Sequence, residues 1–478
     1  MNIKPHYQHD DFNDIREFIR LNLNEKVIPS ITVAVAKDGV IVWEEGFGWA
    51  DRENRVLANE HTMYSLASIS KPITATGLMI LKERGKIDLD KPINDYLGDT
   101  KLKAWVGDSE DATVRRIANH SAGLPIHCQF FYEDEPYSPP PFEETLRRYG
   151  NLVTAPGERY RYSNLGYGIL DYIISRISGK NYSDFIREEV FLPLGMTRAS
   201  VHIGRGHETH HAIRYGVDGL PIPFYDFDHR GASAVYCSTH DLIRFGMFHL
   251  KNHLRDQKAI LSDETIDEMQ RPTVTVNDDI GYGVGWEVTE EAEYSVVSHD
   301  GGMGGVATQL VLVPSENLAV VVLCNARQYA LTCLIAKEIL SLMLPGIRSI
   351  TADEDKEKLE PTKFEPSPML AGKWSGFIHT YKDDIPLSLS IKDSGDIYVK
   401  MGDQLTTLIN DTRFVDGYLK GCFSCDIGTE DANRLPYHLY LDLKHRDNVL
   451  NGSVISISLP GRRAGNAQSY WAELAKAD

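Results

Sequence analysis

The stretch Ser68-Ile69-Ser70-Lys71 opens a helical pattern that runs to about Arg84. Positions i and i+3 lie one helical turn apart, so the Lys71 ammonium is expected over the Ser68 hydroxyl. A serine hydroxyl becomes a strong nucleophile when a nearby base takes its proton, and a desolvated lysine with a lowered pKa can do so. The spacing therefore indicates an acylation centre. Two polar residues that cap a surface helix are the alternative explanation.

A tyrosine and an asparagine follow in Tyr162-Ser163-Asn164, between a Pro-Gly turn and an apolar helical pattern from Leu165 to Ile177. Beside Lys71, the tyrosine is expected to have a lowered pKa and to shuttle protons between the serine and the leaving group. The asparagine would hold the lysine and the substrate amide together. The same spelling occurs at Tyr149-Gly150-Asn151, but the turn and the following helix favour Tyr162. The alternative is a tyrosine packed under a loop.

A glycine-rich third motif, His299-Asp300-Gly301-Gly302, stands directly before an apolar hairpin pattern. Glycines on an edge strand let a substrate backbone approach closely, and their amides are available to an oxyanion. His-x-Gly also occurs at His202 and His229, but only the copy at His299 combines a strand pattern with a glycine run. A plain glycine-rich turn is the rival explanation.

With these three motifs in order, the chain resembles the penicillin-recognising serine hydrolases, which include class C β-lactamases, D-alanyl-D-alanine carboxypeptidases, D-aminopeptidases and related esterases. The resemblance covers about residues 10 to 345. It also includes four framework segments, which are Asn119 to Pro125, Thr239 to Leu242, Tyr282 to Trp286, and Asn325.

The resemblance implies a role for each motif residue. Ser68 would be the nucleophile, Lys71 its activating partner, Tyr162 the general base and acid, and Asn164 the orienting residue. The backbone N–H groups of Ser68 and Gly302 would form the oxyanion hole, with Gly301 beside them, and water would hydrolyse the acyl-enzyme. The family needs no cofactor, and we expect no metal.

One position departs from the best-known family pattern, because His299 stands where many members have a lysine. A histidine with an ordinary pKa is largely neutral at pH 7, so it offers a hydrogen bond more than a charge to a substrate carboxylate. This weighs against an efficient β-lactamase or carboxypeptidase, and His-x-Gly is the version seen in D-aminopeptidases and several esterases.

We therefore expect a serine hydrolase that acts through an acyl-enzyme on small peptides or amides, with a leaning towards D-configured residues and accompanying esterase activity. A carboxylesterase or lactone hydrolase with the same catalytic residues is one alternative. A non-catalytic scaffold that kept the fold is another.

Two hairpin signals lie far apart in residues 1–350. One is Ile31 to Trp43, split by Asp38-Gly39, and the other is Leu310 to Leu323, split by Pro314 to Asn317. Helical patterns lie between and around them, at Asp11 to Asn24, Ile69 to Arg84, Thr239 to Leu250 and Leu331 to Leu344. These patterns predict an α+β domain in which helices flank an antiparallel sheet built from distant parts of the chain.

The chain changes character after this unit. Thr351 to Pro368 is charged and proline-bearing, which is typical of a linker, and residues 369–478 contain about eight short strand patterns. Such a unit suits a small all-β up-and-down barrel, closed so that it leaves no edges. Its opening Gly372-Lys373-Trp374 is similar to the Gly-x-Trp of lipocalin-type barrels. The aromatic residues expected in its core are Trp374, Tyr398, Tyr437, Tyr440 and Trp471.

By analogy with peptidases of the family that carry such a barrel, we expect it to wall off the active-site cleft of its own or a neighbouring chain. The sequence is compatible with a homo-oligomer.

Composition narrows the possible partners. The chain has 478 residues and a formal net charge of −18, which disfavours nucleic acid and anionic membranes. No apolar run approaches eighteen residues and the first ten residues lack a signal-peptide pattern, so we expect a cytoplasmic protein. The six cysteines are expected to be reduced, and Cys422 and Cys425 form a single CxxC without a second pair.

Overall fold

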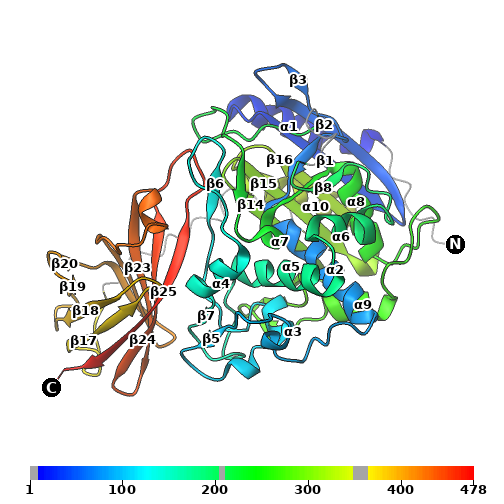
Figure 1. The fold of residues 1–478 in the computed structure, drawn as a ribbon. Coiled ribbons are helices and arrows are strands. Elements are labelled where there is room, and N and C mark those ends of the chain that lie inside the picture. The colour runs from blue at the N-terminus through cyan, green and yellow to red at the C-terminus, as the bar shows by residue number, and fades with distance from the viewer. Residues whose placement is uncertain (1–8, 204–209, 348–363, 478) are drawn as a thin grey trace.

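The computed structural model describes residues 9–203, 210–347 and 364–477, and it places them in a larger α+β part and a smaller C-terminal barrel (Figure 1). In these residues the α+β part contains a nine-stranded antiparallel sheet with the order β11-β12-β13-β14-β15-β16-β1-β2-β3. Its strands are β1 (Ser30–Lys37), β2 (Val40–Asp51), β3 (Val56–Leu57), β11 (Val274–Thr275), β12 (Ile280–Tyr282), β13 (Glu287–Glu291), β14 (Tyr294–Met303), β15 (Val306–Val313) and β16 (Leu318–Cys324).

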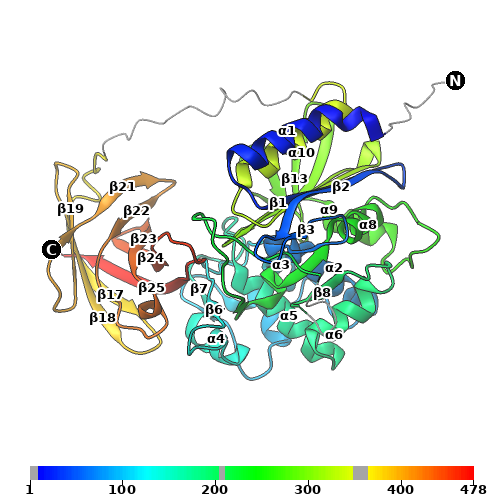
Figure 2. The ribbon, with the colours of Figure 1, turned by 90° about the horizontal axis from the view of Figure 1, so that it is seen from above.

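Helices cover both faces of this sheet (Figure 2). One face packs against α1 (Asn13–Glu25) and α10 (Tyr329–Met343), and the other packs against α8 (Thr239–His249). Beyond α8 lie α2 (Ser70–Glu83), α5 (Asn164–Ser178) and α6 (Tyr182–Ile186). The short α7 (Arg230–Ser233) contacts α2 and α5. The remaining helices are α3 (Val114–Ala118), α4 (Phe142–Tyr149) and α9 (Asp263–Gln270). The predicted α+β architecture is confirmed.

Both predicted hairpins are present, and they meet in the middle of the sheet, where β1 pairs with β16. Asp38 and Gly39 have φ angles of 52° and 78°, which a two-residue type I′ turn requires. Side chains of β1 alternate between the two cores: Val33 and Val35 face α1 and α10, whereas Ala34 and Ala36 face the opposite side. A strand buried on both faces explains the continuous apolar run.

The predicted helices are also present, within two residues of their expected ends. Helix α8 begins at a side-chain cap. The N-cap is Ser238, whose Oγ accepts a hydrogen bond from the Asp241 N–H. This is the side-chain cap that serine commonly provides at a helix start.

Three smaller pairings complete the α+β part. They are β4 (Met63–Ser65) with β10 (Val235–Ser238) and β8 (Ala199–Val201), β5 (Lys103–Ala104) with β7 (Asn151–Leu152), and β6 (Phe130–Tyr132) with β9 (Tyr225–Phe227). Through β4, the chain leading to Ser68 is tied to β10.

The barrel has nine strands in the described residues rather than the roughly eight predicted. They are β17 (Gly372–His379), β18 (Asp384–Ile391), β19 (Ile397–Met401), β20 (Thr407–Leu408), β21 (Asn410–Val415), β22 (Tyr418–Phe423), β23 (Tyr437–Arg446), β24 (Val449–Ser458) and β25 (Ala467–Lys476). Each pairs with its neighbour in the chain, and β17 pairs with β25, but β20 and β21 do not pair. The barrel is therefore nearly closed, and the predicted full closure is wrong at this seam. Most of the predicted linker Thr351–Pro368 lies outside the described residues.

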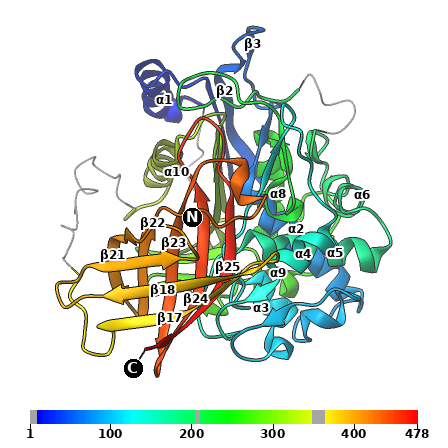
Figure 3. The ribbon, with the colours of Figure 1, turned by 60° about the vertical axis from the view of Figure 1, so that its left-hand side comes forward.

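The predicted aromatic core of the barrel is only partly correct. Trp374 is fully buried, but Tyr398 and Tyr440 are 41% and 36% exposed because they alternate outward along their strands. Trp471 is buried against the α+β part, since its ring stacks on Trp105 with centroids 5.6 Å apart. Strand β25 thus forms the side of the barrel that faces the larger part (Figure 3).

Two further observations concern the described helices and the cysteines. None of the helices in the described ranges is long and apolar enough to cross a membrane. All six cysteines are free thiols, as predicted.

Candidate active site

Ser68 lies in a 3-10 turn, η2 (Ala67–Ile69), that leads directly into α2. The turn is fixed against the sheet because the Leu66 carbonyl accepts a hydrogen bond of 2.9 Å from Thr308 Oγ1. Ala67 has a φ of 49°, an unfavourable left-handed conformation for a residue with a Cβ. Such strain is a common feature of functional sites. Ser68 itself is partly exposed, so a substrate can reach it.

Lys71 is fully buried one turn further along, and its Nζ has three oxygen neighbours. They are Ser68 Oγ at 3.1 Å, Asn164 Oδ1 at 2.8 Å and the Ala232 carbonyl at 3.2 Å. Burial lowers the pKa of Lys71 well below its ordinary value, although the nearby Asp300 opposes the shift. A neutral amine at this position can accept the serine proton.

The Tyr162 hydroxyl donates a hydrogen bond of 2.8 Å to Ser68 Oγ. Burial raises the pKa of Tyr162 well above its ordinary value, so the predicted lowering is wrong. The reason is geometric: Lys71 Nζ lies 4.6 Å from the centroid of the tyrosine ring, over its face, and no described contact joins it to the hydroxyl. The phenol is therefore protonated where the sequence suggested a phenolate.

His120 packs against Tyr162 and bonds to the loop that carries it. No sequence pattern indicated His120 as a site residue. Its Nδ1 accepts a hydrogen bond of 3.2 Å from the Ser163 N–H, and its ring lies 4.5 Å from that of Tyr162. Ser163 Oγ donates to the Pro125 carbonyl at 2.7 Å. The segment from His120 to Pro125, noted before only as a framework match, thus holds the Tyr162–Asn164 loop from behind.

His299 lies beside this cluster rather than in it. Its ring is 2% exposed, with Nδ1 2.7 Å from the Asp300 carbonyl oxygen and Nε2 3.0 Å from the Tyr282 hydroxyl. Burial, together with the charge of Lys71, lowers the pKa of His299 to about 3, so the ring is neutral. Among the described contacts, none joins the ring by a hydrogen bond to Ser68, Lys71 or Tyr162.

Gly301 and Gly302 lie in the part of β14 that pairs with a neighbouring strand on one side only. The β13 ladder covers β14 only from Tyr294 to Ser298, so Gly301 and Gly302 pair on one side alone, with β15. β14 is therefore an internal strand with one free half, and not the edge strand that was predicted. A Cβ on Gly301 would lie 2.2 Å from the Leu66 carbonyl oxygen, whereas Gly302 is exposed with open space around it.

The rival motif copies lie in other surroundings. The Tyr149 hydroxyl donates to Asp431 of the barrel at 2.6 Å. His202 Nε2 lies 3.3 Å from Asp226 Oδ1, and His229 belongs to a separate buried group. The structure thus brings together Ser68, Lys71, Tyr162 and Asn164 and leaves these copies outside.

The sequence matches the beta-lactamase family over residues 15–340. The chain belongs to the beta-lactamase family. Class C β-lactamases are among the solved structures that share its fold.

Two similar family members are 28% and 27% identical to this beta-lactamase family chain. The first is the Unguisins hydrolase ungD' of Aspergillus campestris, aligned over 67% of this chain and 64% of its own length. The second is Penicillin-binding protein 4* of Bacillus subtilis, aligned over 64% of this chain and 70% of its own length. The chain thus spans less than two thirds of the length of the first relative.

Several solved structures share the fold of this chain, although their sequence identity to it is low. An octameric penicillin-binding protein homologue from Pyrococcus abyssi has a TM-score of 0.64 at 23% identity and covers 97% of this chain and 100% of its own. SurE with D-Leu has a TM-score of 0.62 at 18% identity, covering 96% and 100%. A class C β-lactamase has a TM-score of 0.61 at 18% identity, covering 70% and 96%. The first two therefore share the fold along nearly the whole chain.

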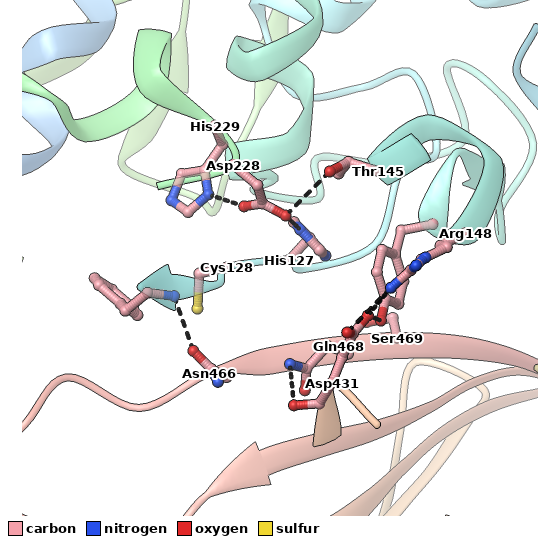
Figure 4. Close-up of polar contacts among 12 residues, drawn as sticks. His127, Cys128, Thr145, Arg148, Asp228, His229, Asp431, Asn466, Gln468 and Ser469 are labelled. Atoms are coloured by element: carbon pink, nitrogen blue, oxygen red, sulfur yellow. Dashed lines mark hydrogen bonds and ion pairs between the residues drawn. The ribbon is translucent and has the colours of Figure 1, made fainter. Parts of the chain in front are cut away.

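Outside the serine cluster, three buried side chains have ligand atoms within 4.8 Å of one another: His127, Asp228 and His229 (Figure 4). Both imidazoles already contact the carboxylate at 2.7 Å. The outer nitrogens, His127 Nδ1 and His229 Nε2, are buried and have no described partner. In this structure the three side chains thus form a hydrogen-bonded group centred on the Asp228 carboxylate.

Proposed function

We propose that the protein hydrolyses small peptides or amides through an acyl-enzyme on Ser68, with a leaning towards D-configured residues and with accompanying esterase activity. The observation that supports this best is the set of distances around Ser68 Oγ. A buried amine lies at 3.1 Å and a protonated phenol at 2.8 Å, beside a free strand edge.

In the proposed mechanism, Lys71 takes the Ser68 proton as Oγ forms a bond to the substrate carbonyl carbon. The N–H groups of Ser68 and Gly302 stabilise the oxyanion. When the intermediate collapses, Tyr162 gives its proton to the leaving nitrogen. It recovers a proton from the Lys71 ammonium once that ammonium moves from the ring face to the hydroxyl. Asn164 holds that ammonium. Water then attacks the acyl carbon, the same groups transfer its proton, and the acid is released.

The substrate preference is proposed from charge and from likeness. The neutral, buried His299 gives a free carboxylate little electrostatic attraction, which disfavours substrates that must be gripped by a C-terminus. One relative is named a hydrolase of unguisins, and one structure of similar fold holds D-Leu. The first supports a hydrolase, and the second is consistent with a site that accepts D-residues.

A panel of D- and L-aminoacyl p-nitroanilides with p-nitrophenyl esters tests this proposal. We expect turnover of D-aminoacyl anilides and of esters, together with covalent labelling by a fluorophosphonate. Ser68→Ala should lose both turnover and labelling. Unchanged turnover by this variant would refute the assignment of Ser68.

The same site also supports a carboxylesterase or lactone hydrolase, because esters acylate more readily than amides. Turnover of esters alone in the panel would favour this second function. A non-catalytic scaffold is disfavoured, because Lys71 and Tyr162 both contact the Ser68 hydroxyl and Asn164 contacts Lys71.

We also propose that the protein forms a homo-oligomer, since an octameric homologue shares its fold over 97% of the chain. Light scattering coupled to size-exclusion chromatography measures this directly, and a monomer at micromolar concentration would contradict it.

A further inference from the structure

The segment from Pro125 to Cys128 lies between the catalytic loop and the barrel. The Pro125 carbonyl accepts from Ser163, which stands between Tyr162 and Asn164. On the other side, the Ile126 carbonyl accepts from Ser469 Oγ at 2.6 Å. Cys128 exchanges two backbone hydrogen bonds of 2.9 Å with Ala467 of β25. These four residues thus contact the site and the barrel at once.

His127 is the residue of this segment whose side chain points away from β25, into the α+β part (Figure 4). Its Nε2 lies 2.7 Å from Asp228 Oδ2, and His229 Nδ1 lies 2.7 Å from Asp228 Oδ1. All three side chains are at most 5% exposed. We call this group the histidine clamp.

The charge of Asp228 makes the clamp rigid. Burial alone would raise the pKa of this carboxyl, but the two histidines hold it well below its usual range. An ionised carboxylate that accepts two N–H groups away from water forms strong hydrogen bonds with defined directions. The clamp therefore fixes His127 and His229 relative to each other.

His229 connects the clamp to the catalytic lysine, because it is the N-cap residue of α7. Two backbone carbonyls of α7 accept hydrogen bonds from side chains of α2. The Gly231 carbonyl accepts from Thr74 Oγ1 at 2.6 Å, and the Ala232 carbonyl accepts from Lys71 Nζ at 3.2 Å. A displacement of α7 would therefore remove one of the three acceptors that orient the amine.

We propose that His127, Asp228 and His229 are positioning residues for the hydrolase reaction, and that β25 of the barrel holds them in place through the Pro125–Cys128 segment. The clamp positions the Ala232 carbonyl beside Lys71. The Pro125–Cys128 segment positions the Tyr162–Asn164 loop on the other side of the site. This inference rests on the proposed roles of Ser68 and Lys71.

Matched substitutions test the clamp. Gln can replace the Nε2–H of His127, and Asn can replace the Nδ1–H of His229, so His127→Gln and His229→Asn keep the donors that His127→Ala and His229→Ala remove. The readout is fluorophosphonate labelling at increasing probe concentration, with melting temperature measured alongside. We expect both alanine variants to lower the maximal labelling rate by up to about 100-fold, as misplaced catalytic groups do. The half-saturating concentration should stay within twofold, and Gln and Asn should restore most of the rate.

The barrel side of the proposal is tested by Ser469→Ala, with Arg462→Ala as its control. Each variant removes one contact between the barrel and the larger part, but only Ser469 contacts the segment, whereas Arg462 pairs with Asp218 at 2.6 Å. We expect Ser469→Ala to slow labelling about fivefold, the equivalent of one hydrogen bond. Arg462→Ala should label at the wild-type rate. If the alanine variants of the clamp do not fold, this pair decides the proposal alone.

The outcomes separate this inference from the proposed function. If wild-type protein is not labelled while Ser68→Ala behaves identically, the assignment of the nucleophile fails. If wild-type protein is labelled and the folded clamp and Ser469 variants all match its rate, the positioning role is refuted. If one equivalent of zinc purifies with the wild-type protein and is absent from His127→Ala, the three side chains are a metal site and the clamp proposal is refuted.

Discussion

At the scale of single residues, the site depends on keeping an amine neutral. Lys71 is fully buried, and the removal of its side chain from water is the main cause of its lowered pKa. We predict that Lys71→Met, which has similar length and no charge to bury, lowers the acylation rate by about 10² to 10⁴. Stopped-flow labelling measures this, and circular dichroism should show an unchanged fold. Wild-type acylation by this variant would remove the lysine from the mechanism.

The pKa shifts of Lys71 and Tyr162 also predict a pH profile. The active form has a neutral amine, which exists above the lowered pKa of Lys71, and a protonated phenol, which exists below the raised pKa of Tyr162. The acylation rate should therefore be highest between these two pKa values, fall as acid protonates the amine, and fall in alkali as the phenol ionises.

Tyr162→Phe tests the alkaline part of that profile. The variant should acylate about 10² to 10⁴ times more slowly with an amide substrate, because the leaving nitrogen loses its proton donor. It should also lack the fall in rate at high pH. A wild-type rate that instead rises in alkali, with the rise absent from Tyr162→Phe, would indicate a working phenolate and contradict the protonated phenol.

Four of the site residues were predictable because their motifs place them at short, regular spacings, as with Ser68 and Lys71 one helical turn apart. The direction of the Tyr162 pKa shift was not, since sequence does not tell whether the amine meets the ring or the hydroxyl. His120 and the histidine clamp were not predictable either. Their partners lie far along the chain, as the separation of 101 positions between His127 and Asp228 illustrates.

At the scale of secondary-structure elements, β14 must pass directly under the turn that carries the nucleophile. Gly301 permits this contact, because a Cβ there would lie 2.2 Å from the Leu66 carbonyl oxygen, whereas a Cβ on Gly302 would meet nothing within 4 Å. We predict that Gly301→Ala displaces η2 and lowers acylation at least tenfold, since small misplacements of catalytic groups are costly. Melting temperature should fall as well.

Gly302→Ala is the matched control on the same strand. It keeps the backbone N–H proposed for the oxyanion hole, so a small fluorophosphonate should react at close to the wild-type rate. Equal losses in both variants would show that strand flexibility, and not the contact with Leu66, explains the glycines.

A strand was predictable where its pattern of apolar and polar residues shows which side chains are buried. The two central hairpins have continuous apolar runs and standard turn residues, and both were predicted. In contrast, β21 is exposed at all but one position, and β17 and β22 each contain a glycine within the strand. The sequence therefore identifies these strands less clearly than it identifies the two hairpins.

At the scale of the whole molecule, the barrel is held by a strand bridge, by ion pairs and by stacked rings. Arg148 lies 2.9 Å from Asp431, and Arg161 lies 2.5 Å from Asp442. These partners are more than 280 residues apart, so no local pattern in the sequence predicts them. We propose the boundaries 1–350 and 369–478 for the two domains. We expect the interface between them to make their unfolding cooperative.

Trp105 offers a test of that cooperativity. Its ring stacks on His379 and Trp471 of the barrel, with centroids 4.9 and 5.6 Å apart, although the side chain is 43% exposed. Aromatic pairs contribute about 0.5–1.5 kcal/mol each beyond buried area, so Trp105→Ala should weaken docking without opening either core. We predict a single calorimetric unfolding transition for the wild type and two for this variant. Trp49→Ala is the control, because Trp49 is similarly exposed, at 38%, but lies on β2. If the wild type already unfolds in two steps, or if both variants keep one transition, the interface does not couple the domains, and the barrel could not hold the histidine clamp through β25.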